Sequence, residues 1–447
     1  MRCCDDFTRA QAGRGLPAIE TGMPEPAGTG LTRRRLLLRG AGMALSVYGA
    51  GRLSQAAFED GIAQAAALPA QPVLVSVFLP GGIDGLSVLA PVTDARYAAG
   101  ALRPTLRLDE ASTLPMSGTP DLRWNTAADP LRQLHDAGKV TVMPAIGYDH
   151  PNQSHFTSRH FWEVGALDTM SRTGWLGRYL DVVGDVNNPV QGLSLDYALS
   201  PALAATRVAV AAAGSPSAYT FASPGVANTT VRNAMLSAVG SVAGGDTPDV
   251  VLGQARQVQR NADALRRQLV TPQPAGTVAY PANNGLAGRL KNLAGLLAAG
   301  LPIRVATANA NGGYDTHADQ AGGLATNLRS TCDAIAAFQS DLEARGGGLA
   351  DRVLVHLWSE FGRRPQENGS RGTDHGAAGV SFLIGTRASG QTVGEFPGLS
   401  SLDGGGNLRA TSDFRGVYSG LLEQWLGADA AQIIPGAAGF GRPVLVR

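Results

Sequence analysis

The sequence predicts an α/β protein with a doubly wound, mostly parallel sheet and helices on both faces, an arrangement that we expect to be alkaline phosphatase-like. Three observations predict this class. Short continuous apolar segments alternate with segments in which apolar residues recur every three or four positions, which is typical of buried strands alternating with helices. The chain has 58 Gly among 447 residues. Charged residues make up only 16%. Abundant glycine with few charges indicates many tight turns rather than a helical bundle.

Each element follows from its local pattern. Residues 72–79 (PVLVSVFL) form an apolar run between a proline and Gly81-Gly82, which predicts a buried strand. The runs KVTVMPAI and RVLVHLW have the same character, whereas the helices show the spacing of an apolar face. The other predicted strands are 139–146, 301–306, 352–358 and 380–384, and the predicted helices are 131–136, 251–269, 286–297 and 324–342.

The amino terminus predicts a leader for export. Residues 32–38 (TRRRLLL) match a twin-arginine pattern, and a moderately apolar stretch and an Ala-rich run with A-x-A cleavage sites follow. We therefore expect a leader at 1–68, in which 1–22 precede the true start if Met23 initiates. Such a protein is exported already folded by the twin-arginine translocase and is periplasmic or secreted. The alternative interpretation is a basic amphipathic helix on a cytosolic protein.

The rest of the chain, 69–447, is predicted to be one α/β domain, with residues 201–247 as an insertion or cap. The 37 basic and 36 acidic residues give no electrostatic footprint for nucleic acid or for an anionic membrane surface. The leader is too short and too interrupted to span a bilayer. Without the leader, Cys332 is the single cysteine, so no redox role through a cysteine pair is expected, and a buried core position is.

Polar residues gather in the loops that flank the predicted strands. Loops that follow parallel strands meet at one edge of the sheet, where ligands bind. The loop before 380–384 reaches that edge only if this strand runs antiparallel or the loop folds back. Mixed Asp/His sets suit Zn, Mn or Fe, and all-oxygen sets suit Mg or Ca. Turn chemistry is the alternative for any single residue. The candidate metal ligands are Asp84, Asp315, His317, Glu360, Asp374 and His375.

Several motifs together resemble a known family. The leader, GGIDGL, HPNQSHF, TGWLGRYL, GGYDTH, SEFGR and GTDHG are similar to the exported bacterial family called "domain of unknown function 1501", from about Val73 to the last strands. That family looks like a distant branch of the alkaline phosphatase and sulfatase superfamily. The resemblance implies a doubly wound core, one or two divalent metals (Zn, Mn, Ca or Mg) at the strand ends, and a nucleophile that forms a covalent phospho- or sulfo-enzyme.

The resemblance also implies roles for single residues. Asp84 matches a ligand of the second metal, Asp315 and His317 the Asp/His pair of the first metal, and His375 the last metal histidine. Ser154 matches the nucleophile. Glu360 resembles the first member of an Asp-His pair.

Two departures from the family pattern matter. Phe361 takes the place of the histidine after Glu360, and the Asp315–His317 spacing is short. These departures leave open a single metal, and His155 rather than Ser154 as the reacting or metal-binding group. Arg363 is a candidate for stabilising the transferring group.

The expected function is an exported, metal-dependent hydrolase of phosphate or sulfate esters that attacks a small anionic substrate through Ser154. The alternative is a non-catalytic periplasmic binding or assembly protein on a degenerate alkaline phosphatase-like fold. The missing histidine at Phe361 motivates this alternative.

Overall fold

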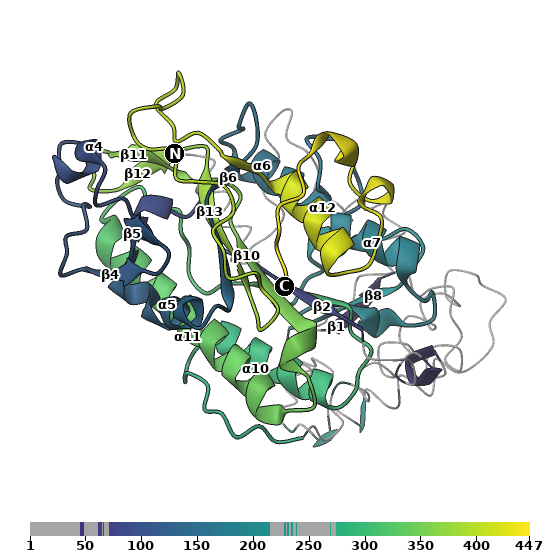
Figure 1. The fold of residues 1–447 in the computed structure, drawn as a ribbon. Helices are drawn as coiled ribbons and strands as arrows, with labels where there is room; N and C mark the ends of the chain where they lie inside the picture. Colours follow the sequence, from purple (N-terminus) through teal and green to yellow (C-terminus); the bar gives the residue numbers. More distant parts are fainter. Residues whose placement is uncertain are drawn as a thin grey trace.

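The structure is a computed structural model. It describes residues 71–214 and 274–447, together with 45–48, 61–64, 66, 228, 230–231, 234–235, 238 and 269 (Figure 1). The leader predicted at 1–68, most of the insertion predicted at 201–247 and the helix predicted at 251–269 lie outside these residues, apart from the positions just given.

The described part of the chain is built around a nine-stranded sheet with the order β1-β8-β7-β9-β2-β10-β13-β6-β14. Strands β8, β7, β9, β2 and β10 run parallel to one another, and β14 runs parallel to β6. Strand β13 is antiparallel to both β10 and β6, and β1 is antiparallel to β8. The strands are β1 Leu45–Tyr48, β2 Val73–Phe78, β6 Val140–Gly147, β7 Gly192–Ser194, β8 Val210–Ala213, β9 Val305–Asn309, β10 Val353–Trp358, β13 Gly379–Ile384 and β14 Ser412–Asp413.

The predicted α/β class is therefore confirmed, with a mixed sheet in which five consecutive strands are parallel. The sequence analysis expects the loop before 380–384 to reach the ligand-binding edge if this strand runs antiparallel, and β13 does run antiparallel to β10. Because β13 starts at the edge where β10 ends, the preceding loop reaches the carboxyl edge of the parallel strands.

Helices cover both faces of the sheet, as predicted (Figure 1). Side chains of β2 alternate between two cores: Val75 and Val77 pack on one face, and Leu74 packs on the other. The first face carries α5 (Asp129–Asp136), α10 (Gly285–Ala298) and α11 (Gln320–Arg345). The second face carries α6 (His155–Val164), α7 (Trp175–Val183) and α12 (Phe414–Gln424).

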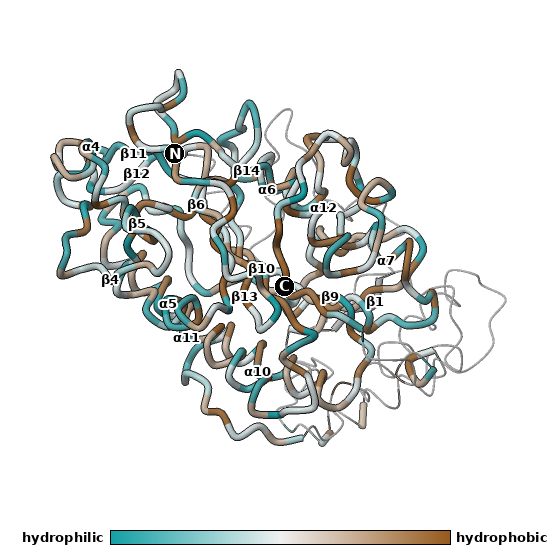
Figure 2. Tube along the Cα trace, viewed as in Figure 1, coloured by the Kyte–Doolittle hydropathy of each residue, from teal (hydrophilic) through white to brown (hydrophobic). Residues whose placement is uncertain are grey.

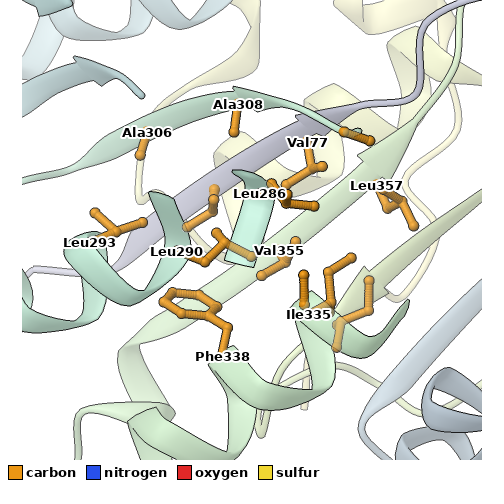
Figure 3. Close-up of a cluster of buried hydrophobic side chains, with 14 of the residues drawn as sticks. Val77, Leu286, Leu290, Leu293, Ala306, Ala308, Ile335, Phe338, Val355 and Leu357 are labelled. Atoms are coloured by element: carbon orange, nitrogen blue, oxygen red, sulfur yellow. The ribbon is translucent and has the colours of Figure 1, made fainter. Parts of the chain in front are cut away.

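The packing of α10 shows how its sequence produces this arrangement. Leu286, Leu290 and Leu293 recur every three or four residues and point at the sheet, where they meet Val77 and Val355 (Figure 3). All five side chains are at most 2% exposed. Burying one such leucine contributes about 1.5–3 kcal/mol, so the apolar stripe holds the helix on the sheet. Along the described part of the trace, hydrophobic residues gather on the central strands, whereas the tube of α5 is largely hydrophilic (Figure 2).

Most predicted elements of the described chain are present with shifted ends. The strand expected at 301–306 begins only at Val305, because Pro302 has no N–H to donate to a ladder and Ile303 folds back onto Leu301. The sequence interpretation missed α6, α7 and α12. It also missed the short helix α4 (Ala95–Ala98) and two small sheets: β3 (Leu89–Ala90), β4 (Thr113–Met116) and β5 (Thr119–Asn125), and the pair β11 (Arg363–Glu367) and β12 (Thr373–His375).

One expectation about composition also holds in the described residues. Cys332 is buried in α11, and burial raises the pKa of its thiol to about 12. Among these residues, none of the helices has both the length and the apolar character needed to cross a membrane.

Candidate metal centre

The polar residues converge at the carboxyl edge of the parallel strands. Asp315 follows β9 and Glu360 follows β10, while His375 is the last residue of β12. His155 is the first residue of α6, the helix that follows β6. Ser154 caps the start of this helix, and Gly165 ends it in the left-handed region with φ 65°.

Asp315 is the centre of the cluster. Its Oδ1 lies 3.0 Å from Nε2 of His317 and 3.4 Å from Nε2 of His375, and its Oδ2 lies 3.5 Å from Nε2 of His155. A terminal nitrogen of Arg363 also donates to Oδ1. Burial on its own raises the pKa of Asp315. When the Nε2 atoms carry protons, their hydrogen bonds and the Arg363 guanidinium outweigh burial and hold the pKa of Asp315 well below its usual range.

Each of these imidazoles is held from behind through its other nitrogen. Nδ1 of His155 lies 2.8 Å from Oε1 of Glu360, and Nδ1 of His317 lies 3.3 Å from Oδ1 of Asp374. Nδ1 of His375 lies 2.8 Å from the carbonyl oxygen of Gln153. All three partners are acceptors, so Nδ1 carries the proton in each ring. In a neutral imidazole, Nε2 then presents its lone pair, and all three Nε2 atoms face Asp315.

This donor set fits a divalent metal. Ligand atoms of His155, Asp315 and His375 all lie within 4.8 Å of one another. Nε2 of His317 is 3.0 Å from Nε2 of His375. Around a tetrahedral zinc with bonds of about 2.0–2.1 Å, neighbouring ligand atoms are about 3.3 Å apart. The distances from Asp315 Oδ1 and Oδ2 to the three Nε2 atoms, 3.0–3.5 Å, bracket that separation.

Glu360 supports the cluster from the protein interior. Its carboxylate is fully buried and accepts hydrogen bonds from the backbone N–H groups of Gly81 and Gly82, at 2.9 and 3.0 Å, and from the Ser359 hydroxyl. Burial alone would raise the pKa of Glu360, but its contacts with His155 bring that pKa below the usual value. Glu360 therefore orients His155 and does not point a free oxygen at the cluster.

The two glycines of the first motif allow the strand-end loops to meet. Gly81 has φ +113°, and a Cβ at this position would lie 2.4 Å from the backbone nitrogen of Asp315. A Cβ on Gly82, with φ +72°, would lie 2.3 Å from the ring of Phe361. Only glycine combines this conformation with such close approach. The Phe361 ring itself lies 4.9 Å, centroid to centroid, from both His155 and His375, so it forms an apolar wall where the resemblance expects a ligand.

Asp84 is not part of this cluster. Its carboxylate is fully buried and forms a two-pronged ion pair with Arg103, at 2.6 and 2.9 Å, and Nε2 of Gln320 and the Ser87 hydroxyl donate to it as well. Burial alone raises the pKa of Asp84, and the Arg103 charge more than offsets this effect, so the pKa is lowered. The resemblance gave Asp84 to a second metal, whereas in the structure protein donors occupy both of its oxygens.

Arg363 is likewise used by the protein. Its Nε donates to the carbonyl oxygen of Gly82, and its terminal nitrogens face the carbonyl oxygens of Gly81, Tyr314 and Thr373, the Asp315 carboxylate and Nε2 of His317. An arginine has five N–H donors, and all five are taken up by these partners. Arg363 therefore joins the loops that form the cluster, and no N–H donor of Arg363 is left for a substrate.

The remaining candidates lie at the margin of the cluster. Ser154 is half-buried, and its hydroxyl accepts a hydrogen bond from the backbone N–H of Thr157, at 3.5 Å, as a helix cap. Its neighbours on both sides, Gln153 and His155, contact the cluster directly. Asp374 is 54% exposed and reaches the cluster through His317.

Some residues of the centre gave no sequence signal. Arg103 lies between predicted elements, outside any motif, and Gln320 opens a helix whose start was placed later. The side-chain oxygen of Gln320 accepts hydrogen bonds from Thr316 and Thr373, so this residue joins the Asp84 ion pair to the two loops that carry Asp315 and His375. A reader of the sequence could have found Ser154 and Gly165 as cap signals for α6.

Comparison with known families gives one match. Residues 142–404, more than half of the chain, match a family described as "Protein of unknown function (DUF1501)". A comparison with curated proteins finds no match.

Proposed function

Because the chain belongs to the DUF1501 family, whose description assigns no activity, we propose a function from the candidate metal centre itself. We propose an exported hydrolase of phosphate or sulfate esters that works with one divalent metal ion. One observation carries this proposal: three imidazoles turn Nε2 toward one carboxylate while an acceptor holds each Nδ1 from behind. Ligating histidines in metalloproteins are held in this way.

We propose His155, Asp315 and His375 as the ligands, with His317 beside them. This mixed nitrogen and oxygen set suits zinc or manganese better than magnesium or calcium. The Asp84 carboxylate is saturated by Arg103, Gln320 and Ser87, so it has no oxygen left for a second ion. The proposal is therefore one ion per chain.

The metal would supply Lewis-acid stabilisation of the charge on the ester group. Glu360 and the Gln153 carbonyl hold two of the imidazoles in place, and the Phe361 ring keeps water from that side. Ser154 is the proposed nucleophile: its Oγ would lose its proton to water and form a bond to phosphorus or sulfur, while the bond to the leaving alcohol breaks and that oxygen takes up a proton. Water would then cleave the serine ester, which releases the inorganic anion and restores the hydroxyl. What supports this role is its place between Gln153 and His155.

The test is hydrolysis of aryl phosphates and aryl sulfates by protein purified without chelator and loaded with zinc or manganese. We expect turnover of one of these ester classes, loss of turnover after chelation, and recovery when the metal returns. His375→Ala should abolish both metal binding and turnover. Arg329→Met, an exposed position on α11, should change neither. A protein that binds the ion and hydrolyses no ester would favour the non-catalytic binding protein.

Export by the twin-arginine translocase is part of the same proposal, and it rests on the leader motif alone. We expect replacement of Arg33, Arg34 and Arg35 by lysine to hold the precursor inside the cell, whereas the unaltered chain reaches the periplasm or medium. Fractionation with immunodetection would show this, and equal export of both forms would contradict it.

A further inference from the structure

Arg159 lies at the carboxyl edge of the sheet. Contacts with the protein hold its guanidinium in place but use only some of the N–H donors of that group. Its Nε donates to Oε1 of Glu163, at 2.8 Å, and its Cζ lies 4.5 Å from the centroid of the Phe78 ring. The Glu163 side chain is only 4% exposed, so the ion pair fixes the Nε side of the guanidinium against the protein. Neither terminal nitrogen of Arg159 has a hydrogen-bond partner among the described residues, although the Asp196 carboxylate lies within electrostatic reach of the guanidinium. The side chain is 24% exposed.

Arg159 belongs to the same rigid framework as the candidate metal centre. It follows His155 by four residues on α6, which places the two side chains on one face of the helix, about one turn apart. The next residue back, Ser158, donates a hydrogen bond of 2.6 Å to the backbone carbonyl of Glu360. The Phe78 ring under the guanidinium belongs to the end of β2, three residues before Gly81. The position of Arg159 relative to His155 and Glu360 is thereby set by helix and strand rather than by a loop.

Three other arginines near this edge are already bonded to the protein. Arg363 uses all its donors, and so does Arg103, which binds Asp84, Ser87 and the carbonyl oxygens of two residues of β11. Arg289 pairs with Asp196. Arg364 has no ion pair among the described residues, but it follows Arg363 in β11. Successive side chains of a strand point to opposite faces, and Arg363 takes the face toward the cluster.

We propose that Arg159, rather than Arg363, recognises the anionic group of the substrate, with its two terminal nitrogens donating to two oxygens of a tetrahedral ester anion. This inference rests on the proposed function and names the residue that selects its substrate class. A planar guanidinium offers two parallel N–H donors in a geometry that matches such an anion. The ion pair with Glu163 and the stacking on Phe78 fix the guanidinium beforehand, so little conformational entropy is lost when the anion binds.

The test is titration calorimetry of the full, metal-loaded protein with inorganic sulfate and, separately, with inorganic phosphate. Arg159→Lys keeps the positive charge beside Glu163 but removes the two parallel N–H donors of the guanidinium. We expect affinity for the preferred anion to fall at least tenfold. Arg159→Met should reduce it further. Arg329→Met is the matched control, because Arg329 also pairs through Nε with an acid four residues later, and it should leave the affinity unchanged.

Metal content, measured on each variant, separates this inference from the proposed function. Arg159→Lys should hold the same amount of ion as the unaltered chain. Equal anion affinity in Arg159→Lys and the unaltered protein would overturn the role of Arg159 and leave the metal-dependent hydrolase standing. A protein that takes up no metal and hydrolyses no ester would overturn the proposed function, while the anion titration would still decide whether Arg159 binds. Comparison of the titrations with sulfate and with phosphate identifies which ester class Arg159 prefers.

Discussion

Two carboxylates stand at the carboxyl edge of the sheet, Asp84 fully buried and Asp315 partly buried, and they differ in what surrounds them. Asp84 is enclosed by the guanidinium of Arg103, the amide of Gln320 and a hydroxyl, all of which keep their protons. Asp315 meets three imidazoles, whose Nε2 atoms can present lone pairs, together with Arg363. The same residue type after a strand therefore serves two purposes.

The comparison teaches that the partners of a carboxylate, not its position alone, decide its chemistry. A carboxylate saturated by permanent donors holds loops together, and removing it leaves a buried cation unpaired. A carboxylate among imidazoles shares its surroundings with groups that a metal can bind. Substitutions at Asp84, Glu360, His356 and Ser154 test this contrast.

Asp84→Asn should cause the greatest loss of stability. It leaves Arg103 buried without a counter-charge, and breaking a buried pair in this way costs about 3–5 kcal/mol. Urea unfolding would measure the loss, and the folded fraction should still bind one metal ion. The matched control is Asp319→Asn, which breaks an ion pair with both side chains exposed and should not change stability measurably. Loss of metal by correctly folded Asp84→Asn protein would instead make Asp84 a ligand.

Glu360→Gln should weaken metal binding without abolishing it. The amide keeps the shape of the side chain but weakens its hydrogen bond to Nδ1 of His155. Changes of this kind behind a ligating histidine lower metal affinity about 10–100-fold. Competition with a chromophoric chelator would measure this change. Complete loss of binding would indicate that Glu360 is itself a ligand, and an unchanged affinity would refute its orienting role.

His356 shows how a buried imidazole behaves without a carboxylate beside it. Burial lowers the pKa of His356 to about 3, below the value near 6.5 of the unfolded chain. The folded protein thus binds fewer protons than the unfolded chain below pH 6.5, and stability is lost as the pH falls from there toward 3. At pH 5 the loss is about 2 kcal/mol, since one pKa unit corresponds to about 1.4 kcal/mol.

Urea unfolding of metal-free protein at pH 7 and pH 5, with and without His356→Gln, isolates this contribution. The substitution removes the titrating ring but retains a group that can bond to Ser381. The difference in stability between the two pH values should shrink by about 2 kcal/mol in the variant. An identical pH dependence in both proteins would mean that His356 does not carry the acid sensitivity.

Ser154→Ala should have the smallest effect on stability and a large one on turnover. The hydroxyl caps α6 through a long hydrogen bond, so its removal should cost about 0.5–1 kcal/mol. Metal content should not change, because Ser154 is not among the proposed ligands. Ester hydrolysis should fall to background if Ser154 is the nucleophile. Full turnover by the variant would assign the attack to another group.

Much of the fold could be predicted from the sequence because its strands are continuous apolar runs bounded by Pro and Gly. The prediction for 352–358 agrees with β10, and that for 286–297 with α10, to within a residue or two. Helix α6 was missed because eight of its ten residues are buried, so its apolar residues do not form a single stripe. Helix α7 does have an apolar stripe, which the sequence interpretation did not use. The reversal of β13 was left open, since strand direction depends on tertiary packing that no local pattern records.

The sequence indicates which Asp and His residues lie near the candidate site, but it does not indicate which side chains and carbonyl oxygens they contact. Asp315, His317 and His375 are brought together as their Gly-rich motifs suggested, and His155 joins them. The fate of Asp84 depends on Arg103, which no motif marks, and that of Arg363 depends on backbone carbonyls that no sequence pattern reveals. Long-range pairings of this kind follow only from the folded arrangement.

The most direct measurement is the number of metal ions bound per chain. Elemental analysis of protein purified without chelator and then loaded with zinc should give one ion per chain for the unaltered protein and for Asp84→Asn, and none for His375→Ala. Two ions per chain, or no ion in the unaltered protein, would contradict a single centre built on Asp315 and its three imidazoles.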